Sequence, residues 1–152
     1  MKNQPDSPAE LRARALRLLA RREHSRAELE RKLDFHAESP EIVAGILEAL
    51  VQKKQLSDER FAAERARQLS RKYGTARIRH DLRGKGVPAE YVERLCKDSS
   101  KSELERGSVM LLKKFPTAAT NFSERAKRMR FLQGRGFSSE IIRSLLSSRD
   151  PG

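Results

Sequence analysis

The chain has 152 residues, which is room for one ordinary globular domain or for a row of smaller units that share faces. Lysine and arginine total 33 against 21 aspartates and glutamates, and this net charge of +12 indicates an anionic partner. The length excludes a large multidomain enzyme, and the interspersed acids and regularly spaced apolar residues exclude a chain that is disordered throughout.

The sequence predicts a protein of the reducing cytoplasm. The single cysteine, Cys96, cannot form an internal disulfide, and residues 1–10 lack the apolar run of a signal peptide. No stretch approaches the roughly 18 consecutive apolar residues that a membrane-spanning helix needs. We therefore expect neither secretion nor a membrane association.

Helix start signals and apolar spacing predict three helices within residues 8–53. Ser7 and Glu10 have the spacing of a capping box, with Pro8 at the first helical position. Ser25 with Glu28 repeats this spacing, and a third start lies at residues 39–40. The apolar stripes that follow these starts have helical period and comprise Leu11, Ala15, Leu18 and Leu19; Leu29 and Leu33; and Ile42, Val43, Ile46, Leu47 and Leu50.

The same order of a long, a short and a medium helix is predicted twice more. Starts lie at residues 57–58 and 87–88, and two further capping boxes are predicted, Ser102 with Glu105 and Asn121 with Glu124. The stripes of the second cycle are Phe61, Ala62, Ala66, Leu69 and Tyr73; Ile78 and Leu82; and Val92, Leu95 and Cys96. Those of the third are Leu104, Ser108, Leu111, Leu112 and Phe115; Met129 and Leu132; and Ile141, Ile142, Leu145 and Leu146. No run has the strand period over a useful length, so the predicted fold class is all-α.

A shift of the first cycle by 49 residues and of the second by 50 superposes equivalent positions without a gap. The aligned columns are Leu33, Leu82 and Leu132; Glu41, Glu90 and Glu140; Val43, Val92 and Ile142; Ile46, Leu95 and Leu145; and Leu47, Cys96 and Leu146. Gly86 and Gly136 also superpose, as left-handed residues that end short helices. The sequence thus predicts three tandem, degenerate three-helix repeats over residues 1–54, 55–99 and 100–152, which stack into an elongated, curved molecule.

No group of residues has the pattern of a catalytic or metal site. His24, His36 and His80 are scattered, and Cys96 occupies a core column with no obvious general base beside it. The glycines of residues 134–136 end a helix, whereas a phosphate loop opens one after a strand. We expect no enzyme activity, no cofactor and no metal.

Two basic clusters are the remaining functional signal. Residues 65–85 carry eight bases and a single acid, Asp81, and residues 125–135 carry a second group of bases with no acid among them. Guanidinium groups, which predominate, bind phosphate or carboxylate through two parallel hydrogen bonds. The residues predicted to bind the anionic partner are Arg67, Arg71, Lys72, Arg77, Arg79, Arg83, Lys85, Lys127, Arg128, Arg130 and Arg135.

Four strings in a fixed order resemble the RecX family. They are HSRAELERKL at residues 24–33, LSDERFA at 56–62, GTARIRHDLRGKGV at 74–87 and FSERAKRMRFL at 122–132, and the resemblance spans nearly the whole chain. It implies tandem three-helix repeats, independently of the register above. The sequence departs from the pattern at Arg128, where an apolar residue is expected, so Met129 is predicted to supply the packing in its place.

The resemblance also implies a function, because RecX proteins regulate the RecA recombinase. They bind along the groove of its nucleoprotein filament and restrain strand exchange and ATP hydrolysis. A monomer that binds the RecA filament on DNA, with weak affinity for single- or double-stranded DNA, is therefore expected, and the two basic clusters are its expected contacts. The alternatives are a stand-alone helical DNA-binding protein and a small enzyme.

Overall fold

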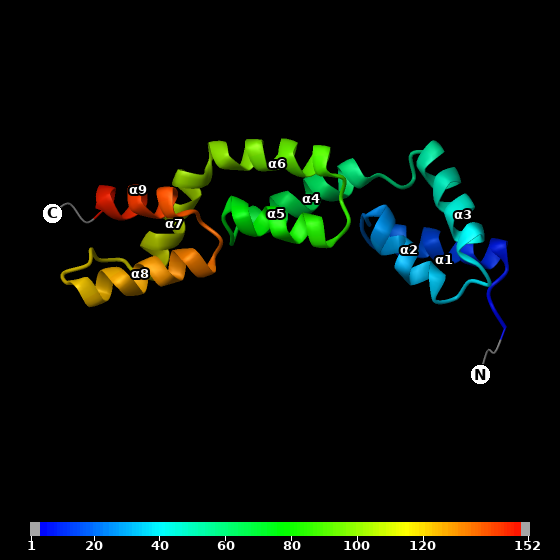
Figure 1. Ribbon diagram of the computed structural model, residues 1–152, viewed down its shortest axis with the longest axis horizontal. Helices are drawn as coiled ribbons and strands as arrows, with labels where there is room; N and C mark the ends of the chain where they lie inside the picture. Colours follow the sequence, from blue (N-terminus) through cyan, green and yellow to red (C-terminus); the bar gives the residue numbers. More distant parts are fainter. Residues whose placement is uncertain (1–3, 150–152) are drawn as a thin grey trace. The chain divides into compact units, whose positions relative to one another are not determined.

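The computed structural model describes residues 4–149, and their regular structure is entirely helical (Figure 1). The all-α prediction is confirmed. The helices of this part of the chain are α1 (Pro8–Arg21), α2 (Arg26–Asp34), α3 (Pro40–Gln52), α4 (Asp58–Ser70), α5 (Thr75–Gly84), α6 (Ala89–Lys101), α7 (Glu103–Lys114), α8 (Phe122–Gly134) and α9 (Ser139–Arg149). None of the helices described is both long enough and apolar enough to cross a membrane.

By its internal contacts the chain divides into two compact units. The N-terminal unit is residues 1–64 with residues 83–91, and the C-terminal unit is residues 65–82 with residues 92–152. Helices α4, α5 and α6 each contribute residues to both units.

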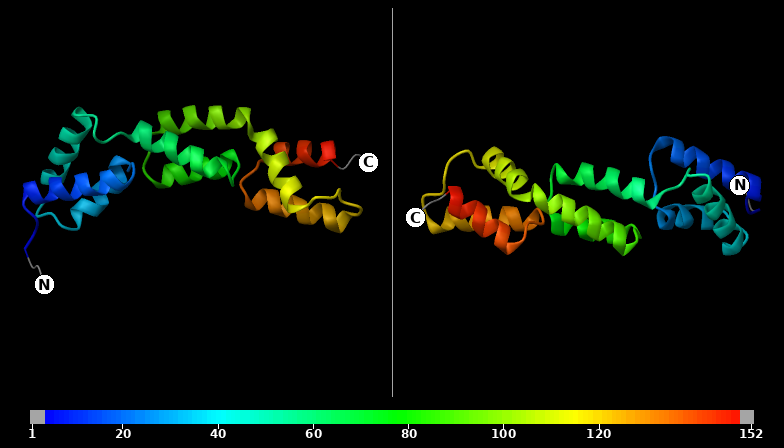
Figure 2. Two further views of the ribbon diagram at one scale, coloured as in Figure 1. Left: turned by 180° about the vertical axis from the view of Figure 1, so that it is seen from behind. Right: turned by 90° about the horizontal axis from the view of Figure 1, so that it is seen from above.

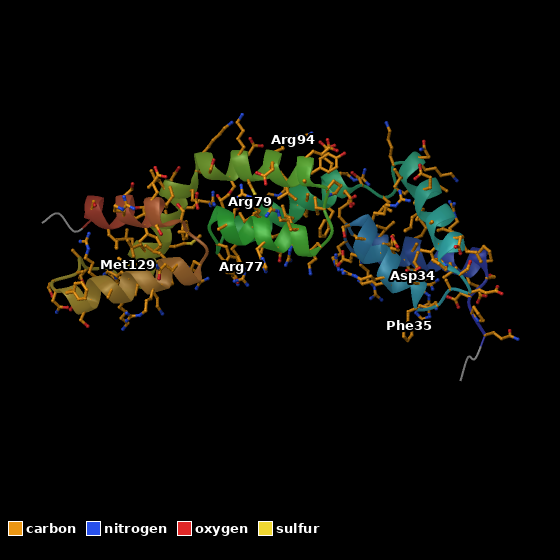
Figure 3. All side chains as sticks on the ribbon, viewed as in Figure 1. Asp34, Phe35, Arg77, Arg79, Arg94 and Met129 are labelled. Atoms are coloured by element: carbon orange, nitrogen blue, oxygen red, sulfur yellow. The ribbon has the colours of Figure 1, made fainter. Side chains whose placement is uncertain are left out.

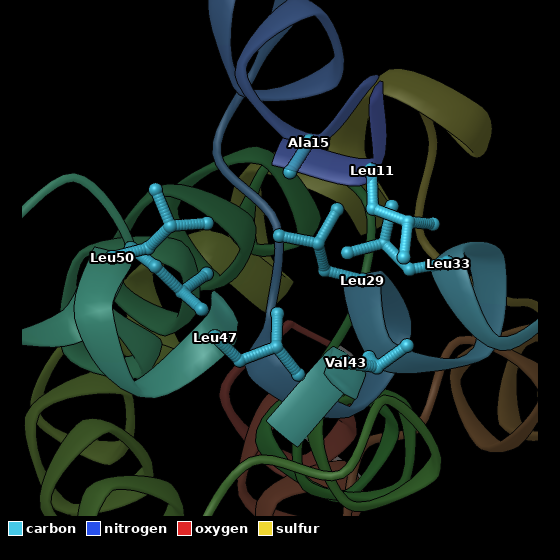
Figure 4. Packing of buried hydrophobic residues seen from close by; sticks show 8 residues of the cluster. Leu11, Ala15, Leu29, Leu33, Val43, Leu47 and Leu50 are labelled. Carbon is cyan, nitrogen blue, oxygen red and sulfur yellow. The ribbon is translucent and has the colours of Figure 1, made fainter. Parts of the chain in front are cut away.

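The core of the N-terminal unit lies between α1, α2 and α3, which contact one another pairwise. Figure 4 shows Leu11 and Ala15 of α1 near Leu29 and Leu33 of α2, and each of these side chains is fully buried. Val43, Leu47 and Leu50 of α3 complete the cluster, together with Leu56. Each buried leucine contributes about 1.5 to 3 kcal/mol relative to an exposed one.

The core of the C-terminal unit lies between α7, α8 and α9, which pack together in all three views (Figures 1 and 2). Its buried members are Leu111, Leu132, Phe137, Ile142, Leu145 and Leu146. Three of the aligned apolar columns are therefore core positions in both units, whereas the column of Glu41, Glu90 and Glu140 is exposed. Leu33, Leu82 and Leu132 are fully buried, and Cys96 is 1% exposed, as predicted.

The prediction for the buried face of α7 is wrong in part. Leu104 and Leu112 are 48% and 57% exposed, and the buried face follows Glu103, Gly107 and Leu111. The reason is close packing, because a Cβ atom at Gly107 would lie 2.7 Å from Leu145 Cδ1. The glycine lets α7 approach α9 along this face, and Leu104 and Leu112 are turned outward while Leu111 stays buried.

The prediction for α8 is also wrong at one position. Arg128 is 6% exposed and occupies the register position of Leu29 and Ile78, whereas Met129 is 40% exposed and is seen on α8 in Figure 3. The Arg128 guanidinium lies 4.6 Å from the Phe115 ring centroid, and its Nη1 and Nη2 donate to the Glu124 and Thr117 carbonyls, both at 3.0 Å. The apolar stem of arginine fills the core position while backbone oxygens satisfy most of its head.

The predicted helix caps are mostly confirmed. Ser7 and Ser25 each form a complete capping box, and Asn121 accepts from the Glu124 backbone N–H at 2.9 Å. The predicted box at Ser102 is wrong, because its hydroxyl donates to the Ser99 carbonyl and makes no cap. Gly86 and Gly136 have φ of 76° and 87°, which confirms their left-handed conformation.

In each unit the start of a short helix packs against the turn that ends another short helix: α2 against the turn after α5, and α5 against the turn after α8. In the N-terminal unit, Ser25 Oγ donates to the Lys85 carbonyl at 2.6 Å, and the Arg26 backbone N–H donates to Asp58 Oδ1 at 2.8 Å. A Cβ atom at Gly86 would lie 2.4 Å from Ala27 Cβ, so only glycine allows this approach. The same arrangement in the C-terminal unit positions the candidate site.

Candidate functional site

A groove lined by positive charge lies in the C-terminal unit, where the ends of α4, α7 and α8 meet. It has a volume of about 400 Å³. We call it the basic groove, and its lining residues are Arg71, Lys72, Met110, Lys113, Lys114, Phe131 and Arg135. Five of these side chains are cations and the other two are apolar, so the groove combines charge with an apolar surface.

Basic residues gather at this groove because three helices end there. Arg71 and Lys72 directly follow α4, Lys113 and Lys114 are the last residues of α7, and Arg135 is the C-cap of α8. Cations are favourable at these positions because the last carbonyl groups of a helix carry partial negative charge. Three helix ends therefore bring five cations to one place.

Glycine contacts hold the α8 end of the groove against the α4 end. The Gly74 backbone N–H donates to the Arg135 carbonyl at 2.7 Å, and that of Ala76 donates to the Gly136 carbonyl at 3.2 Å. A Cβ atom at Gly74 would lie 2.6 Å from the Gly136 carbonyl oxygen. Since any larger residue would separate these segments, the glycine is required for the groove to exist.

Aromatic rings orient the guanidinium of Arg135. Its Cζ lies 5.3 Å from the Phe131 centroid and 5.9 Å from the Tyr73 centroid, and Nη1 makes a long hydrogen bond of 3.4 Å to the Lys72 carbonyl. Arg77 lies over the same Tyr73 ring at 4.6 Å. Contact with a ring does not neutralise a guanidinium group, and neither Arg77 nor Arg135 has a carboxylate partner among the described residues.

The cations of the groove are not neutralised by nearby acids. In the described part of the chain, no carboxylate forms an ion pair with Arg71, Lys72, Lys113 or Lys114. Three other hollows of the described surface each include at least one carboxylate, such as Glu105 in the groove between α7 and α9. The basic groove is therefore suited to an anionic ligand.

The residues predicted to bind the anionic partner lie in several different places in the structure. Arg71, Lys72 and Arg135 line the basic groove, and Arg77 extends it along the Tyr73 ring. Lys127 and Arg130 are exposed on α8, and Arg67 is exposed on α4. Arg83 and Lys85 belong to the N-terminal unit.

Two predicted contacts have other roles. Arg79 binds Glu93 through two hydrogen bonds of 3.1 Å, and this carboxylate raises the pKa of Arg79 above its usual value. Figure 3 labels Arg77 and Arg79 together on α5, yet only Arg79 has a carboxylate partner. Arg128 is buried beneath Phe115 and cannot present its head to a partner, so we leave it out of the contact surface.

Lys113 and Lys114 are site residues that the sequence patterns did not predict. They lie between the two basic clusters, at the end of a helix whose pattern is dominated by its leucines. Adjacent bases at a predicted helix C-terminus are the local signal that identifies them. What the sequence could not supply is their proximity to Arg71 and Arg135, which depends on the packing of α7 against α8.

The described residues contain no grouping of three or more histidine, cysteine, aspartate or glutamate side chains that could hold a metal ion. Cys96 is buried. His24 is buried as well, and its Nδ1 donates to the Arg22 carbonyl at 3.1 Å while Nε2 accepts from Lys32 Nζ at 3.0 Å. Both ring nitrogens are thus occupied by structural hydrogen bonds.

Comparison with known families matches three successive parts of the chain. Residues 12–50 match the first three-helix domain of RecX, residues 57–94 the second and residues 102–146 the third.

Comparison with curated proteins and solved structures agrees. The chain is 41% identical over 139 residues to the regulatory protein RecX of Herbaspirillum seropedicae, covering 91% of this chain and 90% of that protein. It is 39% identical over 140 residues to the protein of the same name from Leptothrix cholodnii, covering 92% and 89%. The crystal structure of RecX from Lactobacillus salivarius superposes with a TM-score of 0.80 at 21% identity, covering 93% of this chain and 95% of that one.

Proposed function

Because the chain belongs to the RecX family, we propose that it regulates a RecA recombinase by binding its nucleoprotein filament. In this proposal the protein inhibits ATP hydrolysis and strand exchange through binding alone and has no chemistry of its own. The family match over three domains supports a regulatory role, as does the name that the relatives carry.

The basic groove is the observation that carries the proposal. A RecA filament on DNA is a polyanion with a helical repeat, and the groove gathers five cations that no acid of the described chain neutralises. The proposed contact surface consists of Arg71, Lys72, Arg77, Lys113, Lys114, Lys127, Arg130 and Arg135, with Arg67, Arg83 and Lys85 as further candidates and Arg79 as a weaker one.

Three repeats in one chain suit a partner that is itself repetitive. Each additional repeat that engages a neighbouring protomer acts at high effective concentration, so weak individual contacts give strong total binding. A protein that binds one filament state more tightly than another shifts the equilibrium between them by that difference in affinity. Inhibition then needs no covalent step, and a monomer suffices.

The test is single-strand-dependent ATP hydrolysis by RecA from the same organism, followed while this protein is titrated from far below to above stoichiometry. Inhibition at small substoichiometric ratios supports capping of filament ends. Inhibition only near one protein for several protomers supports occupation of the filament groove. Unchanged hydrolysis with intact filaments would contradict the proposal and favour the alternative, a stand-alone DNA-binding protein.

A further inference from the structure

We propose that two copies of this chain associate through the exposed face of α7, with the two α7 helices antiparallel about a two-fold axis. The face borders a groove of about 580 Å³ between α7 and α9 in the C-terminal unit. We call it the apolar groove, because Leu104, Leu111 and Leu112 of α7 and Leu145 of α9 line it. The inference goes beyond the proposed function, which needs only a monomer, and concerns the protein in the absence of RecA and DNA.

Exposed apolar side chains are concentrated on the outer face of α7. Leu104 and Leu112 are 48% and 57% exposed, and Val109 between them is 62% exposed. Positions 104, 108 and 112 follow one another at intervals of four, so they lie along one side of the helix, beside position 109. Three of the six large hydrophobic side chains exposed in the described part of the chain belong to this helix. Such a concentration is typical of a surface that another protein covers.

The charged residues of α7 are arranged so that one copy complements another. Glu105 lies in the first turn of the helix and lines the apolar groove, whereas Lys113 is exposed in the last turn. Neither side chain forms an ion pair within the described part of the chain. An antiparallel second α7 inverts this order, so its Lys113 approaches Glu105 while its Glu105 approaches Lys113.

One register satisfies the apolar and the charged residues together. With the two-fold axis near Ser108 and Val109, Leu104 of each copy lies opposite Leu112 of the other copy. The same register brings the acidic end of each helix beside the basic end of the other. A different partner would need an apolar helix with a base at one end and an acid at the other, and the chain itself supplies such a helix in α7.

The expected dimer is weak and reversible. Two helices of 12 residues offer a smaller interface than the roughly 20 to 30 residues a side of a stable complex. The net charge of +12 also opposes the approach of two copies. We therefore expect dissociation constants in the micromolar range or weaker.

The experiment measures the mass of the full chain by sedimentation equilibrium, at fixed salt and from about 1 µM to about 1 mM protein. A monomer–dimer equilibrium that stops at the dimer is expected, because a two-fold pair leaves no matching face free. Leu112→Asp is expected to raise the dissociation constant about tenfold or more, since it places a carboxylate in the apolar contact. The control is Met129→Asp, at an exposed apolar residue of α8 in the same unit, and it is expected to change the constant by less than about twofold. A chain that stays monomeric throughout, assemblies that keep growing, or equal losses in the two variants would overturn the inference.

A charge swap tests the antiparallel arrangement. Glu105→Lys alone places two cations together, and Lys113→Glu alone places two carboxylates together, so each is expected to raise the dissociation constant about threefold to tenfold. The double variant restores opposite charges and is expected to recover most of the affinity. Because Lys113 also lines the basic groove, all samples are freed of nucleic acid before the measurement. A double variant as weak as the two single variants would contradict the antiparallel pairing.

Chemical cross-linking decides the question if a charged variant fails to fold. A cysteine introduced as Val109→Cys lies near the two-fold axis, so a short bismaleimide is expected to join it to its counterpart in the other copy. The natural thiol, Cys96, is buried, and the unmutated protein controls for its reaction. Equal yields of cross-linked dimer from Val109→Cys and Met129→Cys would refute the α7 interface.

The outcome is separable from that of the proposed function. If RecA hydrolysis is inhibited and the protein alone stays monomeric, the regulatory function stands and the self-association is wrong. If the chain dimerises through α7 and RecA is unaffected, the self-association stands and the regulatory function is wrong.

Discussion

Glu103 at the start of α7 caps the start of α5, because its Oε1 accepts a hydrogen bond of 3.0 Å from the Thr75 backbone N–H. The N-terminal unit contains the same relationship between Asp58 of α4 and the backbone N–H of Arg26. A short helix whose own N-cap is Gly74 has no capping side chain, so a carboxylate distant in sequence supplies it. This bond links the first helix of the third predicted repeat to the second.

Replacement of Glu103 by alanine is expected to lower the free energy of unfolding by about 1 to 3 kcal/mol, because a buried N–H loses its acceptor. Burial lowers the pKa of Arg106, and the charge of Glu103 partly offsets this effect. Removal of Glu103 therefore also leaves the buried Arg106 guanidinium less well compensated. Chemical denaturation measures the change. Glu105→Ala is the control, since that side chain is exposed on the same turn, and equal losses in the two variants would contradict the capping role.

Two glycines of the same turn are expected to respond in opposite directions to alanine. Gly136 has φ of 87°, and a Cβ atom there would lie 2.5 Å from Arg77 Cβ, so Gly136→Ala is strained and crowded. A Cβ atom at Gly134, the last residue of α8, would meet no neighbouring segment within 4 Å. Thermal unfolding is expected to show a clear loss for Gly136→Ala and no loss, or a gain of up to about 1 kcal/mol, for Gly134→Ala. Equal melting temperatures would refute the close approach.

Arg128 is expected to act in the core and not in binding. Methionine at this position keeps an unbranched stem under Phe115 and removes a buried guanidinium whose Nε has no partner, so Arg128→Met is expected to change the stability by less than about 1 kcal/mol. Arg128→Ala leaves a cavity and is expected to lose about 2 kcal/mol or more. Denaturant unfolding measures both variants. An equal loss in both would mean that the hydrogen bonds of the guanidinium to the Glu124 and Thr117 carbonyls matter more than the volume of the side chain.

The stability of the N-terminal unit is expected to fall below neutral pH because of His24. Burial lowers the pKa of His24, and the charges of Arg22 and Lys32 act in the same direction, against the Arg22 carbonyl and Glu28. The unfolded state therefore binds a proton more readily, so the contribution is complete above pH 6.5 and is lost as the pH falls from that value towards the lower pKa of the folded state. Urea unfolding of the native protein and of His24→Gln between about pH 5 and 8 tests this. Parallel pH dependences would exclude His24 as the cause.

Inhibition of RecA is expected to depend more on Lys72 than on Arg79. Lys72 lines the basic groove without a carboxylate partner, whereas Arg79 already binds Glu93. Charge reversal at Lys72 is therefore expected to raise the concentration needed for half-inhibition several-fold, and reversal at Arg79 to change it little once helicity is matched. Titrations of RecA hydrolysis with the two variants measure this. The reverse order would place the contact surface on the α5–α6 side of the unit.

The helices, their order and most of the core can be predicted from the sequence. Capping serines, helical apolar spacing and a register that aligns Leu33, Leu82 and Leu132 are local or periodic signals, which depend on neighbours along the chain. For the same reason the left-handed conformations of Gly86 and Gly136 are predictable from their positions after short helices.

Which charged side chains are available to a partner depends on the three-dimensional packing. Arg79 and Arg77 lie two positions apart and look alike in sequence, but one meets Glu93 and the other meets the Tyr73 ring. Arg128 is buried in the core, and Lys113 lines the same groove as Arg135 although the two lie 22 positions apart in the sequence. The physical reason is that Coulomb and hydrogen-bond energies depend on distance in space, which the packing of α7 and α8 sets and which no local pattern encodes.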